Sequence, residues 1–236
     1  MSKSVGFDQK ILLHQLDFTL SEARRTERKD MYEKLDGFLI DDIKGVKSRK
    51  NATTMLMKIW YLVSDDYKKL QSKAFELYPD LSSQERLALH YGMTLLAYPF
   101  VKDLVREMGK LFKLQDEVPA QQIGRIMKNF YGDRRRVEVA ISAVLMSLKS
   151  WGIIKPGEKR HIYKLDEKIS IESNEMKKWL AEAIVRASEG TSITLDEINT
   201  NSLFFPFDYS ISKSELSGEG FEVNRQGLDM IMVGVK

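Results

Sequence analysis

The stretch from Pro119 to Leu165 reads PAQQIGRIMKNFYGDRRRVEVAISAVLMSLKSWGIIKPGEKRHIYKL, and it decides the fold that we expect. Apolar residues first recur at the spacing of an amphipathic helix, at Ile123, Ile126, Met127 and Phe130. Pro119 suits the first position of this helix, where its missing N–H costs nothing. Gly132 is free to take the positive φ that ends a helix, and Asp133 is a good N-cap for the next one.

A second helix and a β-hairpin follow. The helix carries one apolar face, formed by Val137, Ala140, Ile141, Val144, Leu145 and Leu148. Its opposite face is polar, with Arg135, Glu138, Ser142 and Lys149. The sequence Trp151–Ile154 then leaves the helix as a strand, Pro156 and Gly157 supply a turn, and residues 161–165 return as the second strand. The pattern therefore predicts helix, turn, helix and hairpin.

This order resembles the winged helix-turn-helix family, over residues ~100–165. The resemblance implies that the helix from Arg134 enters the major groove of DNA and that the hairpin, or wing, contacts the backbone or the minor groove. The residues in these places are basic or polar: Arg134, Arg135, Arg136, Ser142 and Lys149 on the helix, and Lys155, Lys159 and Arg160 on the wing. Arginines at a helix N-terminus oppose the helix dipole, which favours a role such as contacting phosphate.

Two alternatives stay open for this segment. Winged helices also serve as protein–protein modules, and a run of arginines is often only a solvated face. The distribution of charge favours DNA. Residues 101–165 hold 14 basic and 7 acidic residues, a local charge of +7; because the whole chain of 236 residues carries +3, the remainder carries −4. Localised basicity in a near-neutral chain is the pattern of a nucleic-acid site.

Composition excludes several classes of protein. With 43% hydrophobic and 30% charged residues, the chain is typical of a globular protein. It has no cysteine, which rules out disulfides, thiol nucleophiles and cysteine zinc sites. No apolar run approaches the ~18 residues of a membrane span, and the N-terminus lacks the apolar core of a signal peptide. We therefore expect a cytoplasmic protein with no membrane partner.

A second basic segment lies in the N-terminal half. Residues 8–43 are expected to be helical, and the segment 44–51 contains Lys47, Arg49 and Lys50. Asn51 is a plausible N-cap for a helix over 52–63, so these cations would precede a helix N-terminus and could form a phosphate clamp. The alternative is a polar loop that happens to be basic.

The remaining chain completes a mainly α prediction. Ser82 and Glu85 have the spacing of a capping box, and the dense apolar pattern of residues 87–114 predicts a core shared by the two halves. A helix is expected over 174–188. The tail contains β-like runs, a possible hairpin turn at 224–227, and the aromatic residues Phe204, Phe205, Phe207 and Phe221. We expect a helical domain at 1–98, a winged-helix domain with a trailing helix at 99–190, and a β-rich extension at 191–236 packed on the body or on a second copy.

A second resemblance covers the N-terminal half as well. A basic segment at Lys47–Asn51, the helix containing Leu95 and Leu96, and the step ending in Trp151–Ile154 resemble the BrxA family of BREX phage-defence proteins. This resemblance implies a small cytoplasmic DNA-binding component without known catalytic residues.

The sequence contains no recognisable catalytic pattern. Its three histidines lack metal-binding spacing, there is no phosphate-binding glycine loop, and the Glu27–Lys29 triplet, although spaced like part of a nuclease site, lies in a helical pattern. We therefore expect a non-catalytic protein without cofactor or metal, which binds double-stranded DNA as a regulator or as part of a prokaryotic phage-defence assembly. The alternative is a scaffold subunit that binds other protein subunits through the winged helix and the aromatic tail.

Overall fold

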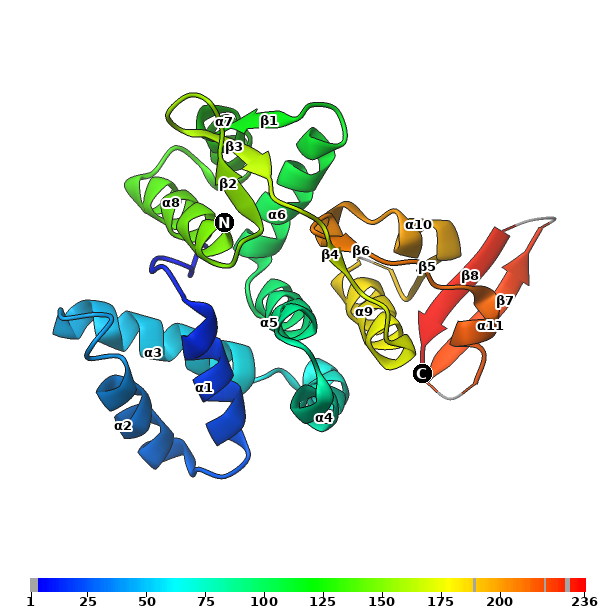
Figure 1. The fold of residues 1–236 in the computed structure, drawn as a ribbon, viewed down its shortest axis with the longest axis horizontal. Coiled ribbons are helices and arrows are strands. Elements are labelled where there is room, and N and C mark those ends of the chain that lie inside the picture. The colour runs from blue at the N-terminus through cyan, green and yellow to red at the C-terminus, as the bar shows by residue number, and fades with distance from the viewer. Residues whose placement is uncertain (1–3, 189, 219, 228–229) are drawn as a thin grey trace.

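The computed structural model describes residues 4–188, 190–218, 220–227 and 230–236, and it confirms a mainly α fold with small sheets (Figure 1). The helices of this part of the chain are α1 (Leu13–Ala23), α2 (Arg28–Phe38), α3 (Val46–Trp60), α4 (Lys68–Leu77), α5 (Ser83–Ala97), α6 (Pro99–Phe112), α7 (Ala120–Tyr131), α8 (Arg135–Ser150), α9 (Asn174–Ala187), α10 (Leu195–Asn199) and α11 (Lys213–Leu216). Short 3-10 turns lie at Asp65–Tyr67, Tyr78–Asp80 and Ser202–Phe204, the last of which is labelled η3.

The strands form three small sheets. They are β1 (Glu117–Pro119), β2 (Ile154–Pro156), β3 (Ile162–Leu165), β4 (Ile169–Ser170), β5 (Ser192–Thr194), β6 (Phe207–Asp208), β7 (Phe221–Gln226) and β8 (Met230–Val235). The sheets β1-β3-β2 and β5-β8-β7 are antiparallel, whereas β4 and β6 pair in parallel.

Helix α5 is the centre of the packing. All ten residues from Leu87 to Leu96 are buried, as expected of a helix that is apolar nearly all round and enclosed by others. It contacts α1, α3, α6 and α9, and Figure 1 shows it between the α1–α4 group, the α6–β3 group and the α9–β8 group. The predicted capping box is present: the Ser82 hydroxyl accepts from the Glu85 N–H, and the Glu85 carboxylate accepts from the Ser82 N–H, each at 3.3 Å.

The elements predicted for residues 119–165 are confirmed as α7, α8, β2 and β3. The sequence missed β1, which pairs with β3 through Val118 and Tyr163 and completes the sheet. Two predicted boundaries are wrong by one residue. Pro119 belongs to β1 and caps α7, and Arg134 rather than Asp133 is the extended N-cap of α8, because the Asp133 carboxylate pairs with Lys128 at 2.8 Å. Gly132 has the expected positive φ, 85°.

One prediction for the N-terminal half is confirmed and one is wrong. Residues 8–43 are helical as expected, in two helices with a break after Ala23. Helix α3 begins at Val46 with Gly45 as its N-cap, so Asn51 lies inside it. The side chain of Arg49 accounts for the earlier start, because it binds the carbonyl groups of Ile43 and Lys44 and so fixes the chain just before the helix.

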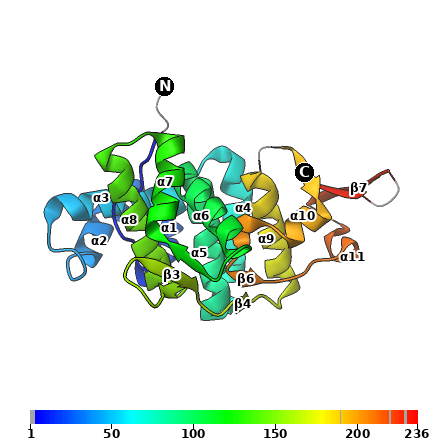
Figure 2. The ribbon, with the colours of Figure 1, turned by 90° about the horizontal axis from the view of Figure 1, so that it is seen from above.

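The tail packs on the helical body. Phe204, Phe205, Phe207 and Phe221 are all buried. The Tyr91 hydroxyl of α5 donates to the Leu203 carbonyl at 2.7 Å, and the Tyr91 ring meets those of Phe204 and Phe207 edge-on. The expected hairpin is β7–β8, but β7 continues through Gln226, and Leu228 and Asp229 between the strands lie outside the described residues. Figures 1 and 2 place this hairpin and α2 at opposite ends of the molecule.

Candidate nucleic-acid interface

Helix α8 has one exposed stripe. Its members recur every three or four residues, which places them on one helix face: Arg135, Val139, Ser142, Met146 and Lys149. We call this set the α8 stripe. Val139 is 37% and Met146 is 47% exposed, although both are apolar. The opposite face of the helix is buried in the core, including Leu145 at 3% exposure.

The end of α8 is fixed to the N-terminal segment of the chain. The Ser147 hydroxyl accepts from the Ile11 N–H at 3.0 Å, and the Trp151 indole donates to the Ile11 carbonyl at 2.9 Å. Both backbone polar groups of Ile11 are thereby satisfied in a buried place. These bonds hold α8 against the body with its stripe facing outward.

The three arginines before and in the first turn of α8 have different surroundings. The Arg134 guanidinium donates to the Tyr131 carbonyl at 2.9 and 3.2 Å, so its charge lies at the C-terminal end of α7, where the helix dipole favours a cation. This contact gives Arg134 a structural role that the sequence did not reveal. Arg135 is 86% exposed and pairs loosely with Glu138 at 3.3 Å. Arg136 is exposed and forms no ion pair within the described residues.

A groove of about 580 Å³ separates α7, α8 and β3. Its lining includes Arg125, Lys128, Ser142, Leu145 and His161. Lys128 is bound at 2.8 Å by both Asp133 and Glu138, and these two carboxylates raise its pKa. The acidic pair therefore offsets part of the positive charge beside the first turn of α8.

The β2–β3 hairpin presents two exposed cations at its tip, Lys159 and Arg160. Neither forms an ion pair with the part of the chain that the structure describes. Lys155, by contrast, pairs with Asp166 at 3.0 Å and lowers the pKa of that carboxyl. His161 at the end of the turn has a positive φ of 61°, and its carbonyl accepts the Ala120 N–H at 2.8 Å, which joins the hairpin to the start of α7.

The second predicted cluster consists of Lys47, Arg49 and Lys50 on α3, and its members differ in their exposure to solvent. Arg49 is only 9% exposed and is engaged inside the protein: its Nε donates to Asp36 at 3.1 Å, besides its bonds to the preceding loop. Arg49 thus joins α3 to α2, and the engagement of its charge inside the protein disfavours the predicted DNA contact. Lys47 and Lys50 are exposed in the first turns of α3. The helices packed most extensively on α3 are α1, α2 and α5, so these lysines belong to a different group from the α8 stripe.

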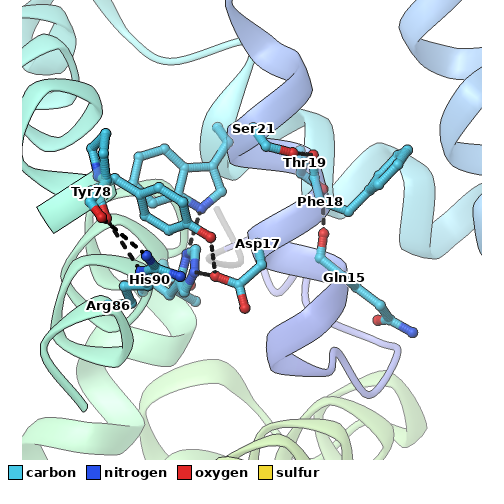
Figure 3. Close-up of polar contacts among 11 residues, drawn as sticks. Gln15, Asp17, Phe18, Thr19, Ser21, Tyr78, Arg86 and His90 are labelled. Carbon is cyan, nitrogen blue, oxygen red and sulfur yellow. Dashed lines mark hydrogen bonds and ion pairs between the residues drawn. The ribbon is translucent and has the colours of Figure 1, made fainter. Parts of the chain in front are cut away.

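A polar network around His90 is the feature most like a catalytic arrangement (Figure 3). The ring Nε2 of His90 lies 3.0 Å from Asp17 Oδ1, which also accepts from the Tyr78 hydroxyl at 2.5 Å. The other ring nitrogen, Nδ1, accepts from the Trp60 indole N–H at 3.0 Å. Because an indole can only donate, His90 carries its proton on Nε2 and has no free lone pair with which to act as a base. The network is therefore a structural one that joins α1, α3 and α5.

This network predicts a pH dependence of stability. Burial lowers the pKa of His90 below its usual value of 6.5, so the unfolded chain takes up this proton at a higher pH than the folded chain does. The contribution of the neutral, buried His90 to the stability of the fold is fully present above pH 6.5 and is lost as the pH falls below that value. We expect the melting temperature to decline as the pH falls below 6.5 and the His90→Gln variant to decline less. Parallel curves for the two proteins, measured by circular dichroism, would show that His90 is not responsible.

Other classes of site have no counterpart in the described residues. In that part of the chain, no group of three or more His, Asp or Glu side chains is arranged to hold a metal ion. No helix described by the structure is both long enough and apolar enough to cross a bilayer. Comparison of the chain with protein-family models, curated proteins and solved structures finds no match. The winged-helix and BrxA resemblances remain predictions from the sequence.

Proposed function

We propose that residues 99–165 form a winged helix-turn-helix that binds double-stranded DNA without catalysing a reaction on it. The order of elements supports this proposal: α6, β1, α7, α8, β2 and β3, with a β1-β3-β2 sheet, is the order that such a unit requires. In this arrangement α8 is the helix for the major groove, and the β2–β3 hairpin is the wing that contacts the backbone.

One observation carries the proposal. Four exposed cations on the two elements that would contact DNA form no ion pair with any described residue: Arg136, Lys149, Lys159 and Arg160. The neighbouring cations Lys128, Arg135 and Lys155 already have carboxylate partners. Cations left without a protein partner are free to neutralise phosphates and to release the counterions that DNA holds, which is the main source of affinity for DNA.

A protein partner is the second candidate function. It is favoured by the exposed apolar residues of the same region, Val139, Met146 and Phe130, the last 45% exposed. The aromatic tail, in contrast, does not support this alternative, because all four of its phenylalanines are buried on the chain itself. A role in regulation or in phage defence stays a proposal from resemblance. One feature of the BrxA resemblance is weakened, since Lys47–Asn51 lies within α3 and not before a helix.

The four cations provide a direct test. We expect the variant with Arg136, Lys149, Lys159 and Arg160 changed to Ala to bind duplex DNA at least about tenfold more weakly near 0.1 M salt, with each lost phosphate contact reducing the salt slope by about 1. The melting temperature should hardly change, because exposed charges contribute little to stability. Fluorescence anisotropy with a labelled duplex measures the affinity.

A matched control removes four exposed cations from other places, Arg28, Lys29, Lys69 and Lys213. Both variants lose four positive charges, so a difference in affinity reports position and not net charge. Equal affinities for the two variants would contradict the assignment of the interface to α8 and the hairpin.

A further inference from the structure

The α8 stripe carries both cationic and apolar side chains, and this combination restricts the kind of partner that it can bind. Cationic side chains lie at its ends, at Arg135 and Lys149, and the two exposed apolar side chains lie between them, on either side of Ser142. Val139 and Met146 leave 37% and 47% of their surface exposed on a face that also carries two cations. A partner that fits this face is anionic overall and offers apolar groups where Val139 and Met146 meet it.

A second copy of this chain does not meet that requirement. In a two-fold pairing of antiparallel α8 helices centred on Ser142, Arg135 of one copy would face Lys149 of the other. A parallel pairing would place each cation against its own equivalent. Both arrangements bring like charges together, which is destabilising. The charges thus select against self-association through this face.

We propose that α8 recognises C5-methyl groups of pyrimidines in the major groove, above all those of thymine, through Val139 and Met146. This inference rests on the proposed DNA binding and specifies the substrate. The thymine methyl is the apolar group that the floor of the major groove presents, and small apolar side chains are its usual contacts. Ser142, between the two, has a hydroxyl that can donate to or accept from a neighbouring base edge.

The spacing of the two side chains fits this assignment. Met146 lies seven positions after Val139, which is about 10 Å along the helix axis at 1.5 Å per residue. Successive bases of one strand rise about 3.4 Å, so the two contacts lie roughly three base-pair steps apart. Lys149, one turn beyond Met146, then reaches toward a flanking phosphate or base. Arg135 lies one turn before Val139, and its exposed pairing with Glu138 at 3.3 Å would have to open for a similar contact.

The test compares two duplexes that differ only in the methyl group: alternating dA and dT, and the same duplex with deoxyuridine in place of every thymidine. Affinities are measured for the full chain at low salt. Loss of one buried methyl contact lowers the affinity about fourfold, and loss of two lowers it roughly fifteenfold. We therefore expect wild type to bind the thymine duplex about 4–15-fold more tightly than the deoxyuridine duplex. The variant Val139→Ser with Met146→Gln is expected to bind both duplexes alike.

Two controls isolate the methyl group. Leu114→Ser alters a side chain that is 83% exposed outside the stripe, and it should keep the preference. A duplex of alternating dG and dC should bind more tightly when every cytosine carries a C5 methyl, because this methyl occupies the same position in the groove.

The outcomes separate the two proposals. Equal binding of both duplexes by wild type would overturn methyl recognition and leave DNA binding intact. A preference that survives in the double variant would also overturn it, because the preference would then come from duplex shape. Absence of binding to either duplex at low salt would overturn DNA binding itself. A dimer that becomes a monomer in the double variant, seen by light scattering, would show that the stripe is a self-association surface and would overturn the inference.

Discussion

A chain that ends after Gly190 is expected to lose cooperative thermal unfolding. The tail supplies Phe204, Phe205 and Phe207, which pack on α5 and α6. Burying each phenylalanine stabilises the fold by about 1.5–3 kcal/mol, so the three together contribute about 5–9 kcal/mol. This is comparable to the total stability of a typical domain. Differential scanning calorimetry should show no sharp transition or one displaced by tens of degrees.

The same truncation distinguishes internal docking from association. Because the tail packs on its own chain, the full protein is expected to unfold with a transition that does not depend on its concentration. A truncated chain that keeps its melting temperature while its mass falls from that of an oligomer would show that the tail belongs to an intermolecular interface. Internal docking of the tail phenylalanines on α5 and α6 would then be wrong.

The addition of a single methyl group at Gly109 is expected to cause the second largest loss of stability. Gly109 lies in α6 where η3 packs most closely, and a Cβ at this position would overlap the carbonyl oxygen of Ser202 and lie 2.9 Å from the Phe205 ring. Backbone cannot yield as a flexible side chain does, so α6 and η3 must separate. We expect Gly109→Ala to cost about 1–3 kcal/mol, as overpacked cores do, measured by urea denaturation.

Gly37 in α2 offers a matched control, because a Cβ there would meet nothing within 4 Å. Replacing a helical glycine with Ala in open space stabilises a protein by about 0.5–1 kcal/mol through backbone entropy. The two substitutions make the same chemical change in two helices and should have opposite signs. If Gly109→Ala also stabilised the protein, the close approach of η3 to α6 would not exist in solution.

The sequence predicted those parts of the fold that depend on neighbouring residues. The apolar stripes of α7 and α8, the positive φ at Gly132 and the capping box at Ser82 are local patterns, and each is present in the structure. The hairpin after Trp151 was predicted for the same reason. The third strand of the same sheet, β1, was not predicted, because a segment of three residues is too short to show an alternating pattern of apolar and polar side chains.

What the sequence could not predict depends on long-range packing. Helix α5 is central because three other groups of elements bury it. The sequence LALHYGMTLL, which is mostly apolar, indicated a buried helix but not which elements would surround it. Arg49 was expected at a phosphate clamp, and only the tertiary position of Asp36 shows that its charge is already used. The same holds for Arg134, whose partner is the end of the preceding helix.

The candidate interface stays a prediction, but the structure shows which of its residues are exposed. Arg136, Ser142, Lys149, Lys159 and Arg160 are exposed, as a surface for DNA requires. Sequence reasoning overlooked Val139 and Met146, because apolar residues in a helix are normally assigned to the core. The signal that could have identified them was their spacing from Ser142, which places them on the polar face.

Binding of the full chain to a duplex over a range of salt concentrations tests the central claim most directly. If α8 and the hairpin neutralise about six phosphates, log K should fall linearly with log salt with a slope of roughly −5. A fluorescence-anisotropy titration at several salt concentrations measures this slope. A value near −5 is the result that winged-helix binding to DNA predicts, and an affinity that does not change with salt, or no binding at low salt, would contradict it.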